Sequence, residues 1–418
     1  MTNNNDCFKN DPQHALLTVE KTLQQIKQAI EPLKTRQTLA IRDALGRTLA
    51  ENVVSSINVP PHRNSAMDGY AINSEFLTSA PPLQLTVIGS SFAGNPFHGK
   101  VSVTECVRIM TGAMMPDDCD TVIMQEDTLR TENIIQINKQ HEKAQNVRHP
   151  GEDIAKNTTV LKAGRQITPA DLGLLSSIGI SEVTTYRKPK VAFFSTGDEL
   201  KSLGETLGPG DIYDSNRYTL FGMLTKLDVD ILDLGVIADD KTLIRETLEK
   251  AASEADMILT SGGASVGEAD YVSEILQEIG QVNFWKIAMK PGKPLAFGMI
   301  NNTPYFGLPG NPVSVMATCY LFVQLAITRL KGLDDNNHLS LQARCLNPLN
   351  KAPGRTDFQR GILKQTTDGV LTVETTGLQG SHILTSMSLA NCFIVIPQNS
   401  GNVAAGETVE VLAFNGII

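Results

Sequence analysis

The sequence feature that most constrains the fold is a regular alternation of strand-like and helix-like segments between residues 190 and 330. Short apolar runs, such as residues 191–195 and 257–260, are separated by longer segments in which apolar residues recur at helical spacing. Alternation over about 140 residues is typical of a mostly parallel sheet with helices on both faces. The region therefore predicts a central, mostly parallel α/β/α sandwich.

Polar, glycine-rich or proline-rich loops follow five of the predicted strands. In an open α/β sheet, ligands bind at the carboxyl ends of the strands, so these loops are expected to converge on one edge. The glycines allow close backbone approach to a phosphate, and a following helix N-terminus favours an anion. This pattern predicts a site for a phosphorylated small molecule. The loops are residues 196–200, 238–240, 261–270, 289–294 and 309–312.

Charged residues in these loops suggest how such a ligand is held. Lysines 286, 290 and 293 supply positive charge for a phosphate or another oxyanion. Glu199, Asp239 and Asp270 are hard oxygen donors, and carboxylates beside a phosphate usually indicate Mg²⁺. Simpler interpretations remain open, since an aspartate at position 270 also suits a helix cap and the other side chains also suit solvent.

Two local patterns do not support the chemistry that they suggest. Residues 94–100 match a phosphate-binding P-loop, but Val101 stands where Ser or Thr is needed, and the following residues alternate like a strand. Ser265 is a poor nucleophile candidate, because residues 190–330 contain no histidine to act as its base. Neither pattern changes the prediction of a ligand site at the sheet edge.

The flanking regions differ in texture from the central one. Residues 16–33, 39–49 and 168–178 are predicted as helices, whereas short β-like runs punctuated by proline and glycine fill the segments before and after them. The predicted organisation is an α/β multidomain chain with a β-rich insertion, a helical linking domain and a C-terminal β-barrel-like domain. The predicted bounds are a disordered tail at 1–15, a discontinuous linking domain at 16–56 and 146–180, the β-rich domain at 57–145, the α/β domain at 181–333 and the C-terminal β-domain at 334–418.

Composition narrows the classes of partner. The net charge of −9 argues against binding to nucleic acid or to anionic membranes. Six scattered cysteines without a CxxC pair argue against a zinc ribbon and against a secreted disulfide framework, and a polar N-terminus favours the cytoplasm. Residues 313–330 are nearly all apolar but carry Ser314, Thr318, Gln324 and Thr328, so a buried core helix is predicted there and not a membrane span.

At these same loops the chain resembles the molybdopterin molybdenumtransferase family, which includes bacterial MoeA and the E domain of gephyrin. The resemblance extends from about residue 16 to the C-terminus and implies four domains per subunit and a homodimer in which the partner subunit completes the active site. The segments that carry it are residues 64–71, 108–113, 151–154, 196–200, 260–271, 290–294, 308–313, 354–361 and 380–383.

The resemblance implies a reaction in which molybdate is inserted into adenylylated molybdopterin and a Mg²⁺-dependent cleavage releases AMP and molybdenum cofactor. It also implies the molybdopterin adenylyltransferase as a possible partner. Glu199 and Asp270 are assigned to Mg²⁺, Lys286 and Lys290 to the pterin phosphate or molybdate. The implied catalytic residues are Asp68, Thr111, Asp153, Glu199, Asp239 and Asp270; the implied substrate-binding residues are Gly262, Gly263, Ser265, Lys286, Lys290, Pro309, Pro312 and Ser381.

Asp68 and Thr111 lie in the β-rich region and are expected to reach the partner's site. Three nearby positions depart from the family pattern: His62 and Arg63 replace an aromatic and an acidic residue, and Asp118 replaces a glycine. These departures leave the local geometry around Asp68 open.

Two other functions and one choice of substrate remain open from the sequence. The first function is a non-catalytic scaffold on the same fold. The second is a CinA-like nucleotide pyrophosphate hydrolase, against which the motifs outside the α/β domain argue. The preference for molybdate over tungstate is the open choice of substrate.

Overall fold

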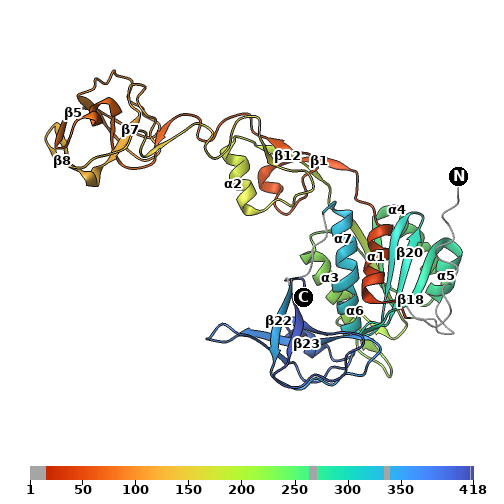
Figure 1. Cartoon of the computed structure of the whole chain (residues 1–418). Helices are drawn as coiled ribbons and strands as arrows, with labels where there is room; N and C mark the ends of the chain where they lie inside the picture. Colours follow the sequence, from red (N-terminus) through yellow and green to blue (C-terminus); the bar gives the residue numbers. More distant parts are fainter. Residues whose placement is uncertain (1–15, 263–270, 334–338, 415) are drawn as a thin grey trace, which may run out of the picture. The chain divides into compact units, whose positions relative to one another are not determined.

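The computed structural model describes residues 16–262, 271–333, 339–414 and 416–418, which fall into two compact units. The first, termed the α/β unit, consists of Met1–Gln37 and Tyr186–Ile418, and the second, termed the insertion unit, consists of Thr38–Thr185. Each unit contains hydrophobic clusters of its own. Figure 1 labels the elements of both.

A six-stranded sheet forms the centre of the α/β unit, in the order β16-β13-β17-β21-β20-β18. The first four strands are parallel, and β20 is antiparallel to both of its neighbours. Two successive reversals restore the direction, so β18 points the same way as the four parallel strands. The bounds are β13 Lys190–Thr196, β16 Asp230–Ile237, β17 Met257–Ser261, β18 Gly280–Lys286, β20 Pro294–Ile300 and β21 Thr303–Leu308.

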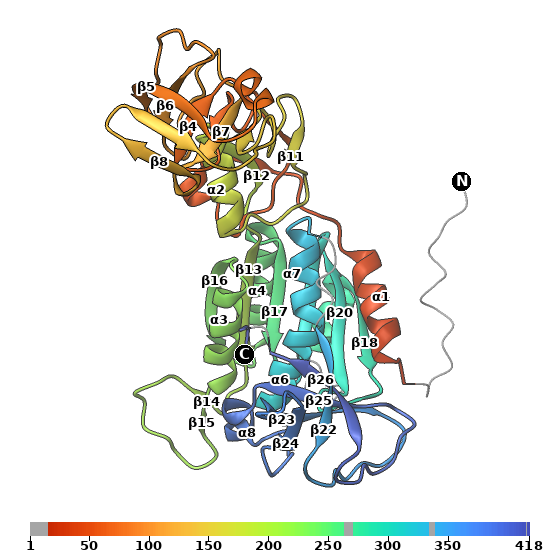
Figure 2. The same cartoon turned by 60° about the vertical axis from the view of Figure 1, so that its left-hand side comes forward.

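Helices cover both faces of this sheet. Alternate residues of β13 face opposite ways: Val191 and Phe193 pack with one group of helices, Ala192 and Phe194 with the other. Figure 2 shows α1, α3 and α7 in front of the strands. The predicted α/β/α sandwich is therefore confirmed. One face carries α1 (Val19–Ala29), α3 (Ser215–Lys226), α6 (Pro312–Thr318) and α7 (Gln324–Leu330); the other carries α4 (Lys241–Glu254) and α5 (Tyr271–Ile279).

The apolar segment near residue 320 is a core helix, as predicted. A π-helical turn, η4 (Cys319–Val323), joins α6 to α7 in one continuous run. Among the described residues, Pro312–Leu330 is the one helix long and apolar enough to span a membrane. Its apolar stretch is 89% buried inside the protein. Its Thr318 hydroxyl donates to the Ser314 carbonyl at 2.7 Å, so this buried hydroxyl is satisfied within the helix.

Helix α1 begins at Thr18, whose hydroxyl accepts the Lys21 amide, and buries Val19 and Ile26 in the core of the α/β unit. The apolar stripe of α1 packs against α7, so this segment contributes to the core of the α/β unit. The predicted domain bounds, among them the assignment of this segment to the linking domain, stay predictions.

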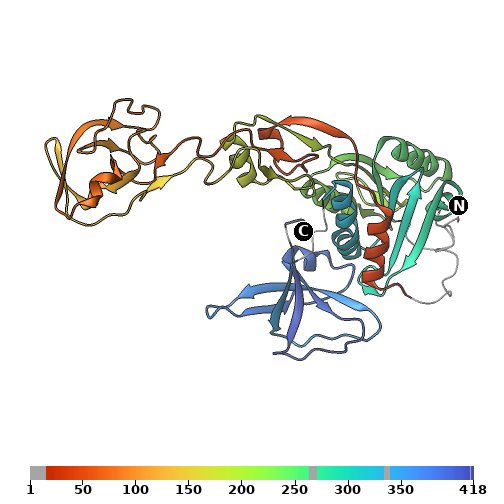
Figure 3. The same cartoon turned by 45° about the horizontal axis from the view of Figure 1, so that its top comes forward.

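The C-terminal strands of the α/β unit close into a barrel, confirming the barrel-like prediction. The pairings β22–β26–β25–β23–β24–β22 form a ring without a free edge. Figure 3 shows these strands in blue. Its Phe358 and Phe393 join the core formed by α6 and α7. The bounds are β22 Ser340–Cys345, β23 Thr356–Gln365, β24 Leu371–Thr375, β25 Cys392–Ile396 and β26 Thr408–Ala413, with α8 at Leu384–Leu389.

The linking part of the insertion unit contains α2 (Pro169–Ser177), which starts with a capping box between Thr168 and Asp171. Residues 39–49, predicted as a helix, are not one. They contribute to β1 (Arg36–Ala40), which pairs with β12 (Glu182–Tyr186), and to the 3₁₀ helix η1 (Ile41–Asp43). The prediction was wrong because Leu39 and Ile41 alternate with exposed residues, as in a strand half-covered on one face.

The β-rich part of the insertion unit is a six-stranded sheet in the order β7-β4-β6-β5-β9-β8. Its strands confirm the β-like texture predicted there. Phe92 and Asn95 close a tight turn by two backbone hydrogen bonds of 3.0 Å, and a strand follows instead of a helix, which excludes a P-loop. The bounds are β4 Gly69–Ile72, β5 Leu83–Ser91, β6 Glu105–Ile109, β7 Thr121–Met124, β8 Thr128–Thr131 and β9 Ile134–Ile137.

Both units also contain pairings that involve short strands. In the insertion unit, β2 pairs with β11 and β3 pairs with β10; in the α/β unit, β14 pairs with β15 and β19 pairs with β23. Their bounds are β2 Val53–Val54, β3 Asn64–Ser65, β10 Val147–Arg148, β11 Thr159–Leu161, β14 Leu200–Lys201, β15 Ile212–Tyr213 and β19 Met289–Lys290.

Gly69 supplies a test of the packing in the β-rich sheet. A Cβ at this position would lie 2.0 Å from the Ile123 carbonyl oxygen of β7, so Gly69→Ala should lower the free energy of unfolding by about 2–4 kcal/mol. Gly173→Ala is the matched control, because a Cβ on this α2 glycine meets open space, and it should stabilise by roughly 0.5–1 kcal/mol. Urea unfolding of both variants checks this; equal stability of the two would contradict it.

Candidate active site at the edge of the central sheet

The strand directions place the predicted loops at one edge of the central sheet. Along this edge, in strand order, lie Asp239 after β16, Glu199 after β13, Gly262 after β17, Pro309 after β21 and Lys286 at the end of β18. Asp270, Gly263 and Ser265 lie outside the described residues. The edge is therefore acidic at the end near β16 and basic at the end near β18.

At the acidic end, the Glu199 carboxylate lies over Gly197. A Cβ at Gly197, whose φ is +143°, would be 2.5 Å from Glu199 Oε2, so only glycine lets the acid take this place. The Asp239 amide donates to Asp198 Oδ1 at 3.2 Å, which adds a third carboxylate at this end of the edge.

Burial, followed by repulsion from Asp198 and Glu199, raises the pKa of Asp239. A divalent cation would relieve this repulsion, and oxygen donors of this kind suit Mg²⁺. Within the described residues, no group of three His, Cys, Asp or Glu side chains is assembled as a metal cage. The carboxylates thus fit a cation that is held jointly with a ligand better than a preformed structural metal site.

Backbone contacts fix the middle of the edge. The Gly262 amide donates to the Leu308 carbonyl at 3.2 Å, and a Cβ at Gly262 would lie 3.1 Å from Thr196 Oγ1. The Asn216 side-chain amide, in the first turn of α3, donates to the Gly310 carbonyl at 2.7 Å. Three loops are therefore held together at the point where a phosphate would meet backbone N–H groups.

Several buried polar atoms at this edge have no hydrogen-bond partner among the described residues. They are Ser195 Oγ, near the end of β13, Asp214 Oδ2, on the residue that caps α3, and Asn216 Oδ1. Buried oxygens of this kind are normally satisfied, so they are available to a ligand or to water. None of the three was predicted from the sequence, although the Asp-Ser-Asn run before an apolar helix, which contains Asp214 and Asn216, was a usable signal.

Ser381 lies beside the start of α6, next to Pro312, although the two residues are far apart in sequence. Pro312 occupies the first turn of α6, where its fixed φ suits a helix start, and the Val313 amide donates to the Ser381 carbonyl at 3.1 Å. Arg360 anchors the loop that carries Ser381: its Nη2 donates to the Gly380 carbonyl at 3.0 Å. Burial lowers the pKa of Arg360 to about 10.

At the basic end, Lys286, Lys290 and Lys293 are exposed. Glu199 at the end of β13 and Lys286 at the end of β18 are four strand spacings apart, roughly 19 Å at about 4.8 Å each. A small ion cannot contact both ends. The edge instead suits an elongated anionic ligand with one part among the carboxylates and another among the lysines.

In the insertion unit, Asp68 and Thr111 are direct partners. Asp68 Oδ1 accepts hydrogen bonds from both the backbone amide and the hydroxyl of Thr111, each at 2.8 Å. These bonds, with a smaller contribution from the Arg108 guanidinium, lower the pKa of Asp68. The pairing of Gly69 with Ile109 across β4 and β6 brings the two residues together. The pair is exposed and keeps a carboxylate charged near the surface.

The remaining predicted residue of this unit, Asp153, is exposed, and its amide donates to the Val59 carbonyl at 3.0 Å. Two of the three departures from the family pattern have structural roles. Arg63 donates to the carbonyls of Asp117 and Cys119, and Asp118 accepts the Val101 amide at 3.1 Å. These hydrogen bonds hold the loop after Met114 in place. The Asp68–Thr111 hydrogen bond forms although Arg63 and Asp118 depart from the family pattern.

Comparison with known proteins covers nearly the whole chain. Residues 17–179 match the "MoeA N-terminal region (domain I and II)", residues 192–329 the "Probable molybdopterin binding domain" and residues 342–414 the "MoeA C-terminal region (domain IV)". The molybdopterin molybdenumtransferase of Haemophilus influenzae is 44% identical over 96% of this chain and 100% of its own length. The chain belongs to the molybdopterin molybdenumtransferase (MoeA) family.

Other members of the MoeA family agree with this assignment. The molybdopterin molybdenumtransferase of a Nostoc species is 34% identical over 96% of this chain and 94% of its own length. The crystal structure of the molybdopterin biosynthesis MoeA protein of Pyrococcus horikoshii superposes with a TM-score of 0.85 at 30% identity, covering 96% of this chain and all of that one. A CinA-like hydrolase is not favoured, because MoeA regions flank the molybdopterin-binding domain on both sides.

The raised pKa of Asp239 gives a test of the acidic end. A carboxyl whose folded pKa exceeds its unfolded value destabilises the fold at any pH above both values, and the effect disappears below the unfolded value. Asp239→Asn should therefore raise Tm by a few degrees near about pH 7.5, and the gain should shrink as the pH falls towards about 4. Calorimetry at both pH values measures it. A gain that does not depend on pH would show that the ionised Asp239 carboxylate is not what destabilises the fold.

Proposed function

We propose that this MoeA-family chain is a molybdopterin molybdenumtransferase that inserts molybdate into adenylylated molybdopterin, with Mg²⁺-dependent release of AMP and formation of molybdenum cofactor. The family membership along the whole chain supports the reaction class. The single structural observation that supports it best is the sheet edge with carboxylates at one end and lysines at the other. Adenylylated molybdopterin is an elongated anion of the kind that this edge suits.

The two ends take different parts of the ligand in this proposal. Glu199 and Asp239 face the adenylate phosphates, and Mg²⁺ bound there offsets their negative charge. Asp270, which lies outside the described residues, is assigned to the same Mg²⁺. Lys286 and Lys290 bind molybdate or the terminal phosphate of the pterin by charge-assisted hydrogen bonds. Gly262, Pro309 and Pro312 supply a stiff backbone wall between the two ends.

A second copy of the chain completes the proposed site. The Asp68–Thr111 pair is assigned to the active site of the partner subunit, and its exposure fits that role. Residues 203–221 also carry an unusual number of exposed apolar side chains, which fits a homodimer interface. They are Leu203, Leu207, Ile212, Tyr213, Tyr218 and Phe221, each between 40% and 60% exposed. A cytoplasmic location and the molybdopterin adenylyltransferase as a partner belong to the same proposal.

The activity has a direct test. Purified protein incubated with Mg²⁺, molybdate and adenylylated molybdopterin should release AMP and yield cofactor that activates an apo-molybdoenzyme. Glu199→Gln should lower kcat at least about 100-fold, because the variant keeps the shape and loses the charge at the acidic end. Glu254→Gln, at the last residue of α4, is the matched control and should retain full activity. Replacing molybdate by tungstate in the assay measures the preference between the two anions.

Retention of AMP release in Glu199→Gln at the wild-type rate would remove this residue from the site. Complete absence of AMP release in the wild-type protein would leave the non-catalytic scaffold as the function of the fold.

Light scattering tests the homodimer. The wild-type protein should have twice the mass of the chain, and Phe221→Asp, which puts a charge into the proposed apolar interface, should shift it to the monomer. If the dimer also shares its sites, mixing an Asp68→Ala protein with a Glu199→Gln protein should restore part of the activity. No recovery in verified mixed dimers would show that each site is built within one chain.

A further inference from the structure

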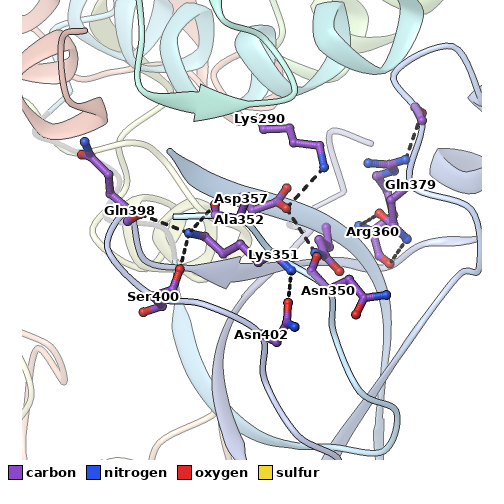
Figure 4. Close-up of polar contacts among 12 residues, drawn as sticks. Lys290, Asn350, Lys351, Ala352, Asp357, Arg360, Gln379, Gln398, Ser400 and Asn402 are labelled. Atoms are coloured by element: carbon purple, nitrogen blue, oxygen red, sulfur yellow. Dashed lines mark hydrogen bonds and ion pairs between the residues drawn. The ribbon is translucent and has the colours of Figure 1, made fainter. Parts of the chain in front are cut away.

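Lys290, one of the proposed oxyanion-binding residues, has a buried carboxylate beneath it. Its Nζ lies 3.7 Å from Asp357 Oδ2, and the side-chain exposures are 48% for the lysine and 6% for the aspartate (Figure 4). The strands β19 and β23 set this contact, because Lys290 and Asp357 are paired in register. Two segments far apart in the sequence thus meet at the basic end of the sheet edge.

A second cation lies close to Asp357 but is buried. Lys351 is 7% exposed, and its ammonium donates to the carbonyls of Ser400 at 2.8 Å, Gln398 at 3.1 Å and Ala352 at 3.4 Å (Figure 4). An ammonium has three N–H donors, so these carbonyls saturate it. Burial lowers the pKa of Lys351, and the negative charge of Asp357 opposes that effect. Lys351 therefore balances charge within the fold and has no donor left for a ligand.

Asp357 itself is held in place by neutral groups. The Gln359 side-chain amide donates to Asp357 Oδ2 at 3.2 Å and also to the Asn350 carbonyl at 3.1 Å. The carboxylate thus has a fixed position and an internal counter-charge. Among the described residues, Asp357 is the one ion-pair partner found for the Lys290 ammonium, which leaves that ammonium with N–H donors to spare for an oxyanion.

Stability alone does not explain this arrangement. Burying a carboxylate carries a large desolvation cost, whereas an ion pair with a half-exposed lysine returns only about 0–1 kcal/mol. A free lysine samples many rotamers, and restricting it before binding removes an entropic cost of association. The benefit of Asp357 is therefore expected in ligand binding.

We infer that Asp357 is a positioning residue: it holds the Lys290 ammonium at the basic end of the edge, while the buried Lys351 supplies a counter-charge to Asp357. The ligand group concerned is a tetrahedral oxyanion, either molybdate or the pterin phosphate. This inference rests on the proposed function and extends it, because Asp357 acts through Lys290 without touching the ligand.

A double-mutant cycle tests the inference. Asp357→Asn should lower kcat/KM about ten-fold in the wild-type background, mainly through KM, and less than about two-fold in the Lys290→Ala background. Separate titrations of molybdate and of adenylylated molybdopterin show which KM rises, and hence which oxyanion Lys290 binds. Glu374→Gln is the matched control, because it breaks an exposed ion pair with Lys364 in the same barrel and should change neither parameter.

Equal losses from Asp357→Asn in both backgrounds would overturn the inference, since the residue would then act through the fold and not through Lys290. That result would leave the proposed function intact, because the wild-type protein would still turn over.

A measurement without turnover separates the two proposals further. Labelling by acetic anhydride, read by mass spectrometry, should increase at Lys290 in Asp357→Asn and stay unchanged at Lys364. Asp357→Glu keeps the charge and should label Lys290 nearly as slowly as the wild-type protein does, which also serves if the Asn variant folds poorly. Unchanged labelling of Lys290 in Asp357→Asn would overturn the inference that Asp357 holds the Lys290 ammonium, even if no transferase activity were found.

Discussion

Strand β20 runs antiparallel to both of its neighbours, and the composition of the candidate site depends on this reversal. Because β18 and β20 form an antiparallel pair, β18 ends at the same edge as the parallel strands, and Lys286 lies there with Glu199 and Asp239. A right-handed crossover to a parallel strand would also have reached this edge, but only through another helix. The antiparallel pair instead delivers a short, proline-stiffened loop carrying Lys290 and Lys293.

The separation of charge along the edge lowers the stability of the free protein at the acidic end. At the basic end, buried groups beneath Lys290 balance the charge. At the acidic end, burial and then like charges raise the pKa of Asp239, so the free protein is less stable than it would be with a neutral residue there. At the basic end, the lysines are exposed, and Asp357, Lys351 and Gln359 form a neutralising layer beneath Lys290. The acidic end therefore gains from a cation, whereas the basic end is prepared for an anion before it arrives.

The sequence predicted the edge well because the rule that ligands bind at strand ends needs only strand order and direction. Glu199, Asp239 and Lys286 follow from it without any family knowledge. Asp68 and Thr111 came from the resemblance alone, since a turn before a strand gives no sign that its aspartate meets a threonine some forty residues away. Their contact depends on the register of β4 with β6, which a single sequence does not specify.

The residues that could not be predicted from the sequence are those that hold another site residue in position. Asp357 and Arg360 lie on one barrel strand, where alternation predicts burial but not a partner in the α/β domain. Helix prediction failed at residues 39–49 for a related reason, because pairing with β12, more than 140 residues away, decided the local structure.

Backbone hydrogen bonds join the barrel to the site. The side chains of the barrel are therefore not needed for this junction and can take part in ligand binding. Two junctions link them: β19 pairs with β23, and the Ser381 carbonyl accepts the Val313 amide. Both junctions are independent of side-chain identity, so substitutions on β23 leave the register of Lys290 and Asp357 in place. Position 357 can therefore carry a buried aspartate, which packing alone would not favour. A carboxylate buried at such a junction is best explained by its effect on the lysine above it.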